Sequence, residues 1–145
     1  MTSNIPSISV VVPSHNDERH IEACLDSLLG QTLKPSEIVV CDDASTDGTR
    51  SVVRDWQRRH PEVSLLLVPH DEHVGIPRNF NSGLLAASGE YVSLLAADDY
   101  WMPPKLEMEY RLIVARQVRW AYSKVELQFD ERGSDSVCQP FRVSL

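Results

Sequence analysis

The sequence lacks the features that mark several common functional classes. Its 145 residues include only 3 cysteines, and 21 acidic residues outnumber 14 basic ones for a net charge of −7. The cysteines have no CxxC spacing, so neither a disulfide framework nor a zinc knuckle is expected. We interpret Cys24 and Cys41 as small buried side chains in a reducing compartment. The acidic balance argues against a nucleic acid partner, whose phosphates need clustered Lys and Arg.

Long apolar segments are also missing. No run approaches the roughly 18 residues that cross a membrane, and residues 1–6 lack the basic-then-apolar profile of a signal peptide. A chain of 145 residues suits a single domain spanning residues 1–145. These absences predict a cytoplasmic globular domain with no membrane span.

The 6 glycines exclude two familiar phosphate-binding motifs. They form no GxGxxG, and none is followed by Lys, so the dinucleotide fingerprint and the P-loop are both absent. A GxSxG hydrolase elbow is missing as well. The histidines are scattered, and His70 and His73 have no Cys or third His beside them, so a histidine metal site is not expected.

The apolar pattern that is present alternates between the strand and helix periods. Short β-branched or aliphatic runs predict strands at 8–12, 38–41, 63–68 and 91–95, and helical spacing predicts a helix after each of them. A final alternation over 125–129 predicts a half-exposed antiparallel strand. Strands alternating with helices predict an α/β, Rossmann-like, doubly wound and mostly parallel sheet.

Local signals place the ends of these helices. Asn16 or Asp17 is a candidate N-cap for the first helix, and Gly30 stands where that helix should stop. Pro77 suits the first turn of the third helix. The expected apolar faces of the third and fourth helices are Phe80, Leu84 and Ala87, and Leu106, Tyr110, Ile113 and Val114.

Polar residues follow three of the predicted strands, at the edge where open α/β sheets bind ligands. Pro13-Ser14-His15-Asn16 follows the first, Asp42 to Thr49 the second, and Asp98-Asp99 the fourth. Paired carboxylates repel each other unless a cation neutralises them, so they predict a divalent metal such as Mg²⁺ or Mn²⁺. The alternative is that the carboxylates form turns and helix caps, which Asp and Ser favour.

The same residues resemble family 2 glycosyltransferases with the GT-A fold. The resemblance begins at Ser9-Val10-Val11-Val12-Pro13-Ser14-His15-Asn16, close to a typical S-V-V-I-P-T-Y-N, and continues in the family's order to about residue 130. It includes Cys24-Leu25-Asp26-Ser27-Leu28-Leu29, Glu37-Ile38-Val39-Val40, Asp42-Asp43-Ala44-Ser45-Thr46-Asp47-Gly48-Thr49, Arg78-Asn79, Gly89-Glu90-Tyr91-Val92 and Asp98-Asp99-x-Trp101-x-Pro103.

The resemblance implies transfer of a sugar from a nucleoside diphosphate sugar, with inversion, to a saccharide or lipid-linked acceptor. It implies that Pro13, His15 and Asn16 contact the base and ribose, and that Asp43 binds the base edge with support from Asp42. Asp98 would reach the ribose, Asp98 and Asp99 would hold Mg²⁺ or Mn²⁺, and Arg78 would balance the phosphates unless it is only a solvated residue at a helix start. It also allows association with the inner face of a membrane.

The chain departs from the family in three places. Ala96 stands where the family commonly has the first carboxylate of its metal motif, and His15 replaces a Tyr. The family's general base lies beyond the last residue of this chain, so we expect a GT-A domain with its acceptor part missing or truncated. Two alternatives to an active transferase are a non-catalytic nucleotide-sugar-binding module and a receiver-type domain. The receiver is the weaker of these, because its acidic residues would also follow the first strand.

Overall fold

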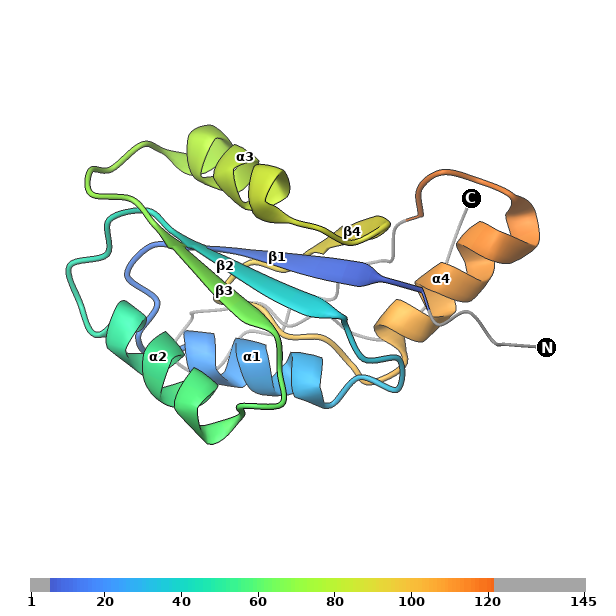
Figure 1. Ribbon diagram of the computed structural model, residues 1–145, viewed down its shortest axis with the longest axis horizontal. Helices are drawn as coiled ribbons and strands as arrows, with labels where there is room; N and C mark the ends of the chain where they lie inside the picture. The colour runs from blue at the N-terminus through green and yellow to red at the C-terminus, as the bar shows by residue number, and fades with distance from the viewer. Residues whose placement is uncertain (1–5, 122–145) are drawn as a thin grey trace, which may run out of the picture.

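A computed structural model describes residues 6–121 as a four-stranded parallel sheet with helices on both faces (Figure 1). The elements are β1 (Ile8–Ser14), α1 (Ile21–Leu29), β2 (Glu37–Asp42), α2 (Thr49–Arg59), β3 (Leu65–Pro69), α3 (Ile76–Ala86), β4 (Tyr91–Leu94) and α4 (Lys105–Arg116). The predicted α/β doubly wound fold is confirmed. The expected antiparallel strand at 125–129 lies outside the described residues.

The strand order β3-β2-β1-β4 makes β3, β2 and β1 neighbours, so their carboxyl ends lie together. All three pairings are parallel, and the register sets Ser14 opposite Asp42 and Asp42 opposite Pro69. Beyond β4 the chain stays beside β1, because the Ala97 N–H donates to the Pro13 carbonyl at 3.2 Å. The residues that follow each strand therefore meet at one edge of the sheet.

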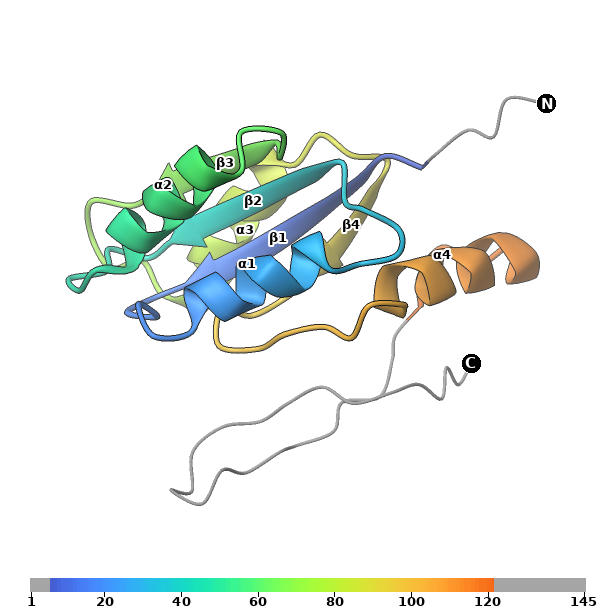
Figure 2. The ribbon, with the colours of Figure 1, turned by 90° about the horizontal axis from the view of Figure 1, so that it is seen from below.

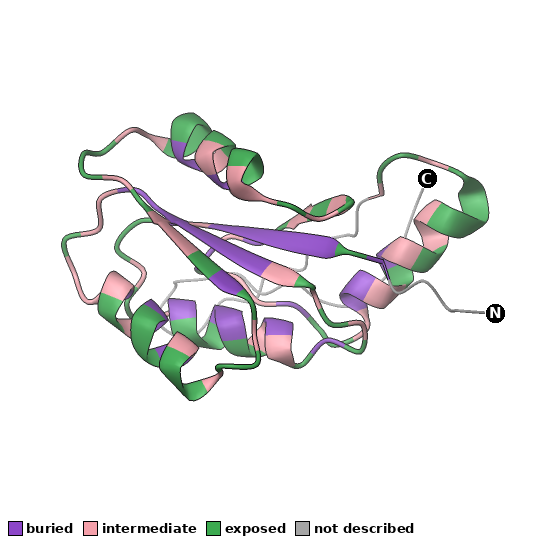
Figure 3. Ribbon diagram, in the orientation of Figure 1, coloured by how far each residue is buried: buried purple, intermediate pink, exposed green. Residues whose placement is uncertain are grey.

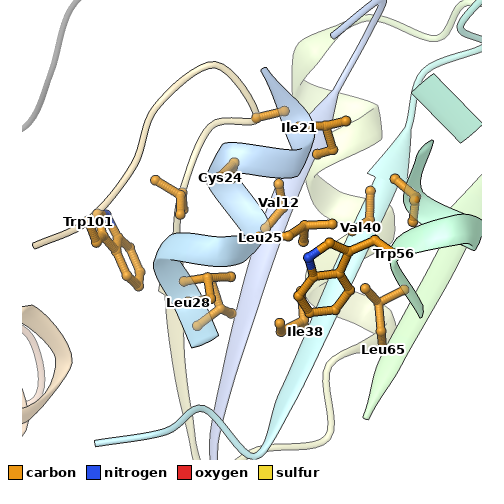
Figure 4. Close-up of a cluster of buried hydrophobic side chains, with 14 of the residues drawn as sticks. Val12, Ile21, Cys24, Leu25, Leu28, Ile38, Val40, Trp56, Leu65 and Trp101 are labelled. Carbon is orange, nitrogen blue, oxygen red and sulfur yellow. The ribbon is translucent and has the colours of Figure 1, made fainter. Parts of the chain in front are cut away.

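One face of the sheet is covered by α1 and α2, which lie in front of it in Figure 2. The core between them holds most of the buried aliphatic side chains together with Trp56 and Trp101 (Figure 4). Trp56 is completely buried, and its indole N–H donates to Asp26 Oδ1 at 2.8 Å, so its one polar atom is satisfied. Cys24, also in this core, and Cys41 are buried free thiols, as expected.

Among residues 6–121 the helix on the opposite face is α3, and its apolar face is predicted only in part: Ala87 packs against the sheet core as expected, but Leu84 does not. Its buried residues are Asn79 and Gly83, whereas Leu84 is exposed and Phe80 is only half-buried. Most of the helix is coloured as exposed or half-buried in Figure 3. A Cβ at Gly83 would lie 2.5 Å from Val11 Cγ1, closer than real atoms approach. The helix therefore packs against the sheet through its smallest residue, and the close approach leaves no room for larger side chains.

The predicted side-chain cap of α1 is also absent. The helix begins after His20 without a side-chain cap, and the Asp17 carbonyl accepts from the backbone N–H of His20 and Ile21, each at 2.9 Å. The Asp17 carboxylate instead accepts from the Ser14 hydroxyl and the His15 N–H, each at 2.9 Å. Its role is to fold the loop after β1 rather than to start the helix.

The fourth helix begins after Pro104 and lies at the β4 side of the sheet (Figure 1). Leu106 is buried there, but Val114, which the pattern placed on the apolar side, is 53% exposed. Lys105 lies 3.5 Å from the centroid of the Trp101 ring and 2.8 Å from Glu109. Within residues 6–121, no helix combines the length and the apolar character needed to cross a membrane.

Candidate functional site

A cavity of about 560 Å³ opens at the carboxyl edge of the sheet. This volume is within the range of small-molecule sites, roughly 300–1,000 Å³. The segments that follow all four strands and the start of α3 form its walls. Its lining residues are Pro13, Ser14, His15, Asp43, His73, Ile76, Pro77, Asn79 and Ala96.

Asp43 is the buried acid of this cavity, only 2% exposed. Its carboxylate accepts from the backbone N–H of Val74 at 2.6 Å and of Gly75 at 3.0 Å. Gly75 has φ +84°, a conformation that suits glycine and that turns its N–H toward the carboxylate. Burial alone would raise the pKa of Asp43, but these donors and the nearby imidazoles of His73 and His15 hold it below its usual value. The site therefore contains a fixed negative charge.

Two histidines flank this carboxylate. The His15 Nδ1 lies 2.6 Å from the Asp43 carbonyl oxygen, which can only accept, so Nδ1 carries the proton and Nε2 keeps its lone pair. The His73 Nδ1 lies 3.1 Å from Asp43 Oδ2, and the two rings are 4.8 Å apart between centroids. Within the described part of the chain these three side chains form the one cluster of three or more His, Cys, Asp or Glu residues that could hold a metal ion.

Asp42 lies behind the cavity in a network of its own. It is completely buried and accepts from the Ser45 hydroxyl at 2.5 Å and from Arg50 Nε at 2.5 Å. Arg50 also donates to the carbonyl of His70 at 2.5 Å. This buried pair joins the end of β2, the start of α2 and the end of β3, and it fixes the loop that carries Asp43.

Asn16 connects the first two loops rather than entering the cavity. Its Oδ1 accepts from the Thr46 N–H at 2.8 Å, and its own N–H donates to the Ser45 hydroxyl at 2.8 Å. Both Asn16 and Ala44 have positive φ, +60° and +54°, in the loops that follow β1 and β2. Alanine rarely adopts a positive φ angle, and such a conformation is retained where the surrounding contacts fix it.

Asn79 lines the cavity and carries an unmet polar group. Its Nδ2 donates to the Cys41 carbonyl at 2.9 Å, which fixes the orientation of the amide. Its Oδ1 is buried and is the one such side-chain atom within residues 6–121 that has no hydrogen-bond partner. An unmet buried acceptor costs about 1–3 kcal/mol, so a ligand that donates a hydrogen bond here would recover that energy.

The two acids after β4 follow the lining residue Ala96 of this cavity, separated from it in the chain by Ala97. Asp98 is exposed and Asp99 is half-buried. Burial, and then the charge of Asp98, raise the pKa of Asp99 above its usual value. The charge of Asp98 is thus unfavourable to the ionised form of Asp99, and the assignment of the pair to a metal stays a prediction.

The predicted site residues fall into three groups. Pro13, His15 and Asp43 line the cavity. Asn16 and Asp42 hold its loops from behind. Asp98, Asp99 and Arg78 are not in its wall, and Arg78 is exposed in the first turn of α3 with no ion pair to residues 6–121.

Sequence reasoning missed His73 and Asn79. His73 was set aside together with His70, yet His70 contacts the Ser82 hydroxyl at 2.9 Å, whereas His73 joins His15 and Asp43. The useful signal was its position a few residues after β3, at the same sheet edge as the other loops. Nothing in the sequence distinguishes a buried Asn79 from a surface helix residue.

Comparisons with known proteins place this geometry in a family. A sequence model described as Glycosyl transferase family 2 matches residues 9–141. The Escherichia coli protein WfgD, a UDP-Glc:alpha-D-GlcNAc-diphosphoundecaprenol beta-1,3-glucosyltransferase, is 32% identical over 120 residues, which are 83% of this chain and 46% of that protein. The chain spans about half the length, or less, of such curated relatives.

Solved structures agree in fold. The mannosyltransferase PcManGT from Pyrobaculum calidifontis, in complex with GDP-Man and Mn²⁺, superposes with a TM-score of 0.65 at 34% identity, covering 90% of this chain and 37% of that one. S. aureus TarS 1-349 in complex with UDP-GlcNAc gives a TM-score of 0.71 at 28% identity, covering 86% of this chain and 35% of that one. With its GT-A fold and its match from residue 9 to residue 141, this chain belongs to glycosyl transferase family 2.

Proposed function

We propose that this chain forms the nucleotide-sugar-binding part of an inverting, metal-dependent glycosyltransferase. The observation that carries the proposal is the cavity at the carboxyl edge, which combines the Asp43 carboxylate with the unmet acceptor of Asn79. A nucleobase has ring and amino N–H groups that donate to such acceptors, and it has flat faces that pack on apolar walls. Pro13 and Ile76 supply part of those walls.

The donor in this proposal is a nucleoside diphosphate sugar. Support comes from relatives whose complexes contain GDP-Man, UDP or UDP-GlcNAc. In this assignment Pro13 and His15 contact the base and ribose, Asn16 holds the loop that carries them, Asp42 steadies Asp43, and Asp98 reaches the ribose. Arg78, exposed at the start of α3, would balance the phosphates.

The residues after β4 fit a divalent metal. Asp98 and Asp99 offer hard carboxylate oxygens, the ligands that Mg²⁺ and Mn²⁺ prefer, and the raised pKa of Asp99 reflects a charge that needs a partner. A bound ion would supply charge stabilisation to the departing nucleoside diphosphate. The Mn²⁺ in the PcManGT complex supports the proposal of a divalent ion.

The acceptor is proposed to be a saccharide or a lipid-linked saccharide. WfgD, whose printed activity uses a diphosphoundecaprenol-linked acceptor, supports the second of these. Lipid-linked acceptors would bring the protein to the inner face of a membrane from a cytoplasmic location. The buried free thiols of Cys24 and Cys41 are compatible with a reducing compartment.

Calorimetric titration tests the proposal. UDP, GDP and TDP are titrated into the chain with and without Mn²⁺, and we expect one of them to bind only with the metal. Asp99→Asn should abolish this metal-dependent binding, whereas Asp55→Asn, which removes an exposed acid of α2, should leave it unchanged. If no nucleotide binds in either condition, the proposal is refuted. Binding without any sugar transfer would favour a non-catalytic nucleotide-sugar-binding module.

A further inference from the structure

The group formed by His15, Asp43 and His73 suits a metal ion of a different class from the one proposed at Asp98 and Asp99. One ring nitrogen of each histidine and one carboxylate oxygen of Asp43 lie within 4.8 Å of one another. Three loops contribute, after β1, β2 and β3, which are neighbours in the sheet. We propose that these residues form a second metal site that takes Zn²⁺ or a similar transition metal ion, and that an ion there excludes the nucleotide.

The spacing supports the first half of this proposal. Zn²⁺ binds imidazole and carboxylate atoms at roughly 2.0–2.2 Å in a tetrahedron, which separates two ligand atoms by about 3.3 Å. The His73 Nδ1 and Asp43 Oδ2 are already 3.1 Å apart, so the ion would take the place of the proton between them. His15 keeps the lone pair on Nε2, whose present contact is a 3.2 Å hydrogen bond from the Asn16 amide.

The surroundings of the group resemble those of a built metal site. The N–H groups of Val74 and Gly75 hold the Asp43 carboxylate in place, and the Asp43 carbonyl orients the His15 ring. Such outer contacts fix the direction of metal ligands and raise affinity. The side chain of His73 is 63% exposed, so it can make much of the adjustment of about 1.5 Å that closing the tetrahedron requires.

The donor set determines which ion is preferred. Two imidazoles and one carboxylate favour Zn²⁺, Co²⁺, Ni²⁺ or Cu²⁺, whereas Mg²⁺ prefers oxygen ligands and retains its water. The site at Asp98 and Asp99 has the opposite preference, because it offers only carboxylates. The two sites should therefore be separable by the choice of metal.

The position of the group supports the second half of the proposal, that a bound ion excludes the nucleotide. This half rests on the proposed function. His15, Asp43 and His73 all line the cavity assigned to the nucleobase. An ion held by these three side chains would bind the carboxylate oxygen of Asp43 that the nucleobase would otherwise use. It would also draw the His15 ring across the opening of the cavity. Zn²⁺ and nucleotide would then compete for one space, and micromolar free Zn²⁺ would act as an inhibitor of donor binding.

Metal binding is measured first, without nucleotide. Zn²⁺ is titrated calorimetrically into the full chain, and Co²⁺ binding is followed by its visible absorption. We expect one Zn²⁺ per chain, at least tenfold weaker in His73→Gln and in His15→Gln. The matched control is His60→Gln, a histidine at the end of α2 that packs on Trp56 and lies at the opposite edge of the sheet; it should bind Zn²⁺ as the parent does. Circular dichroism verifies that every variant is folded.

Two results would overturn the metal site: no Zn²⁺ binding at millimolar concentration, or equal Zn²⁺ affinity in all variants. The competition between Zn²⁺ and the nucleotide is then measured with the free Zn²⁺ concentration fixed by a metal buffer. Chelation of Zn²⁺ by the nucleotide then does not change the free Zn²⁺ concentration. Saturating Zn²⁺ should raise the Kd for the nucleotide at least tenfold, and an unchanged Kd would refute the overlap. If nucleotide binds but Zn²⁺ does not, only this inference fails; if Zn²⁺ binds and no nucleotide does, the proposed function fails instead.

Discussion

The buried pair of Asp42 and Arg50 should be a main support of the loop that carries Asp43, and its energy can be measured. Asp42 has no exposed surface, whereas the Arg50 side chain is 27% exposed. Removing one partner of a fully buried pair costs about 3–5 kcal/mol. Because water reaches part of Arg50, we expect Arg50→Met to lower the free energy of unfolding by about 2–3 kcal/mol.

Urea denaturation of a double-mutant cycle isolates the pair. Asp42→Asn removes the charge that Arg50 neutralises, so adding it to Arg50→Met should recover part of the loss, with a coupling energy of about 1–2 kcal/mol. The control Arg58→Met breaks an ion pair with Asp55 whose two side chains are 76% and 56% exposed. It should change stability by less than about 0.5 kcal/mol. Additive effects of the two buried substitutions would refute the reasoning.

Two further predictions concern packing and pH. Gly83→Ala should lower the free energy of unfolding by about 1–3 kcal/mol in urea, because the added Cβ overlaps the sheet; an unchanged midpoint would contradict this close packing. Burial alone would raise the pKa values of Asp43, Asp47 and Glu37, but the hydrogen bonds they accept hold them below their usual values. Because these three carboxylates bind protons more readily in the unfolded chain, unfolding takes up protons. The stability that they contribute is therefore present above about pH 4, and it should be lost as the pH falls through their lowered pKa values. Asp99, with its raised pKa, acts in the opposite direction. Denaturant midpoints from pH 7 to pH 3 measure the balance, and a midpoint that rises on acidification would contradict it.

The arrangement of the sheet could be predicted because its sequence signals are local. The β-branched run that ends at Pro13 and the paired acids Asp42 and Asp43 mark strand ends, and parallel strands bring their ends to one edge. This rule predicts that Pro13, His15 and Asp43 lie close together, and all three line the cavity. The same rule applies to the loop after β3, and there it predicts that His73 lies at this edge of the sheet.

The face that α3 buries could not be predicted from periodicity. A hydrophobic pattern favours Leu84, but the helix approaches the sheet through Gly83, and this brings the polar Asn79 inside. Only the three-dimensional contact with the Cys41 carbonyl shows why an amide is accepted there. The start of α1 differs for a similar reason, because Asp17 bonds to its own loop rather than to the helix.

The central claim is that the cavity between the loops after β1, β2 and β3 binds the nucleotide. The most direct test is amide chemical-shift mapping of the isotope-labelled chain during titration with a nucleoside diphosphate and Mg²⁺. We predict shifts concentrated in residues 13–16, 42–45 and 73–79. A smaller groove of about 210 Å³ between β4 and α4, with Tyr91 and Tyr110 in its wall, provides an internal comparison. Shifts confined to that groove, or no saturable shifts in the three loops, would contradict the account.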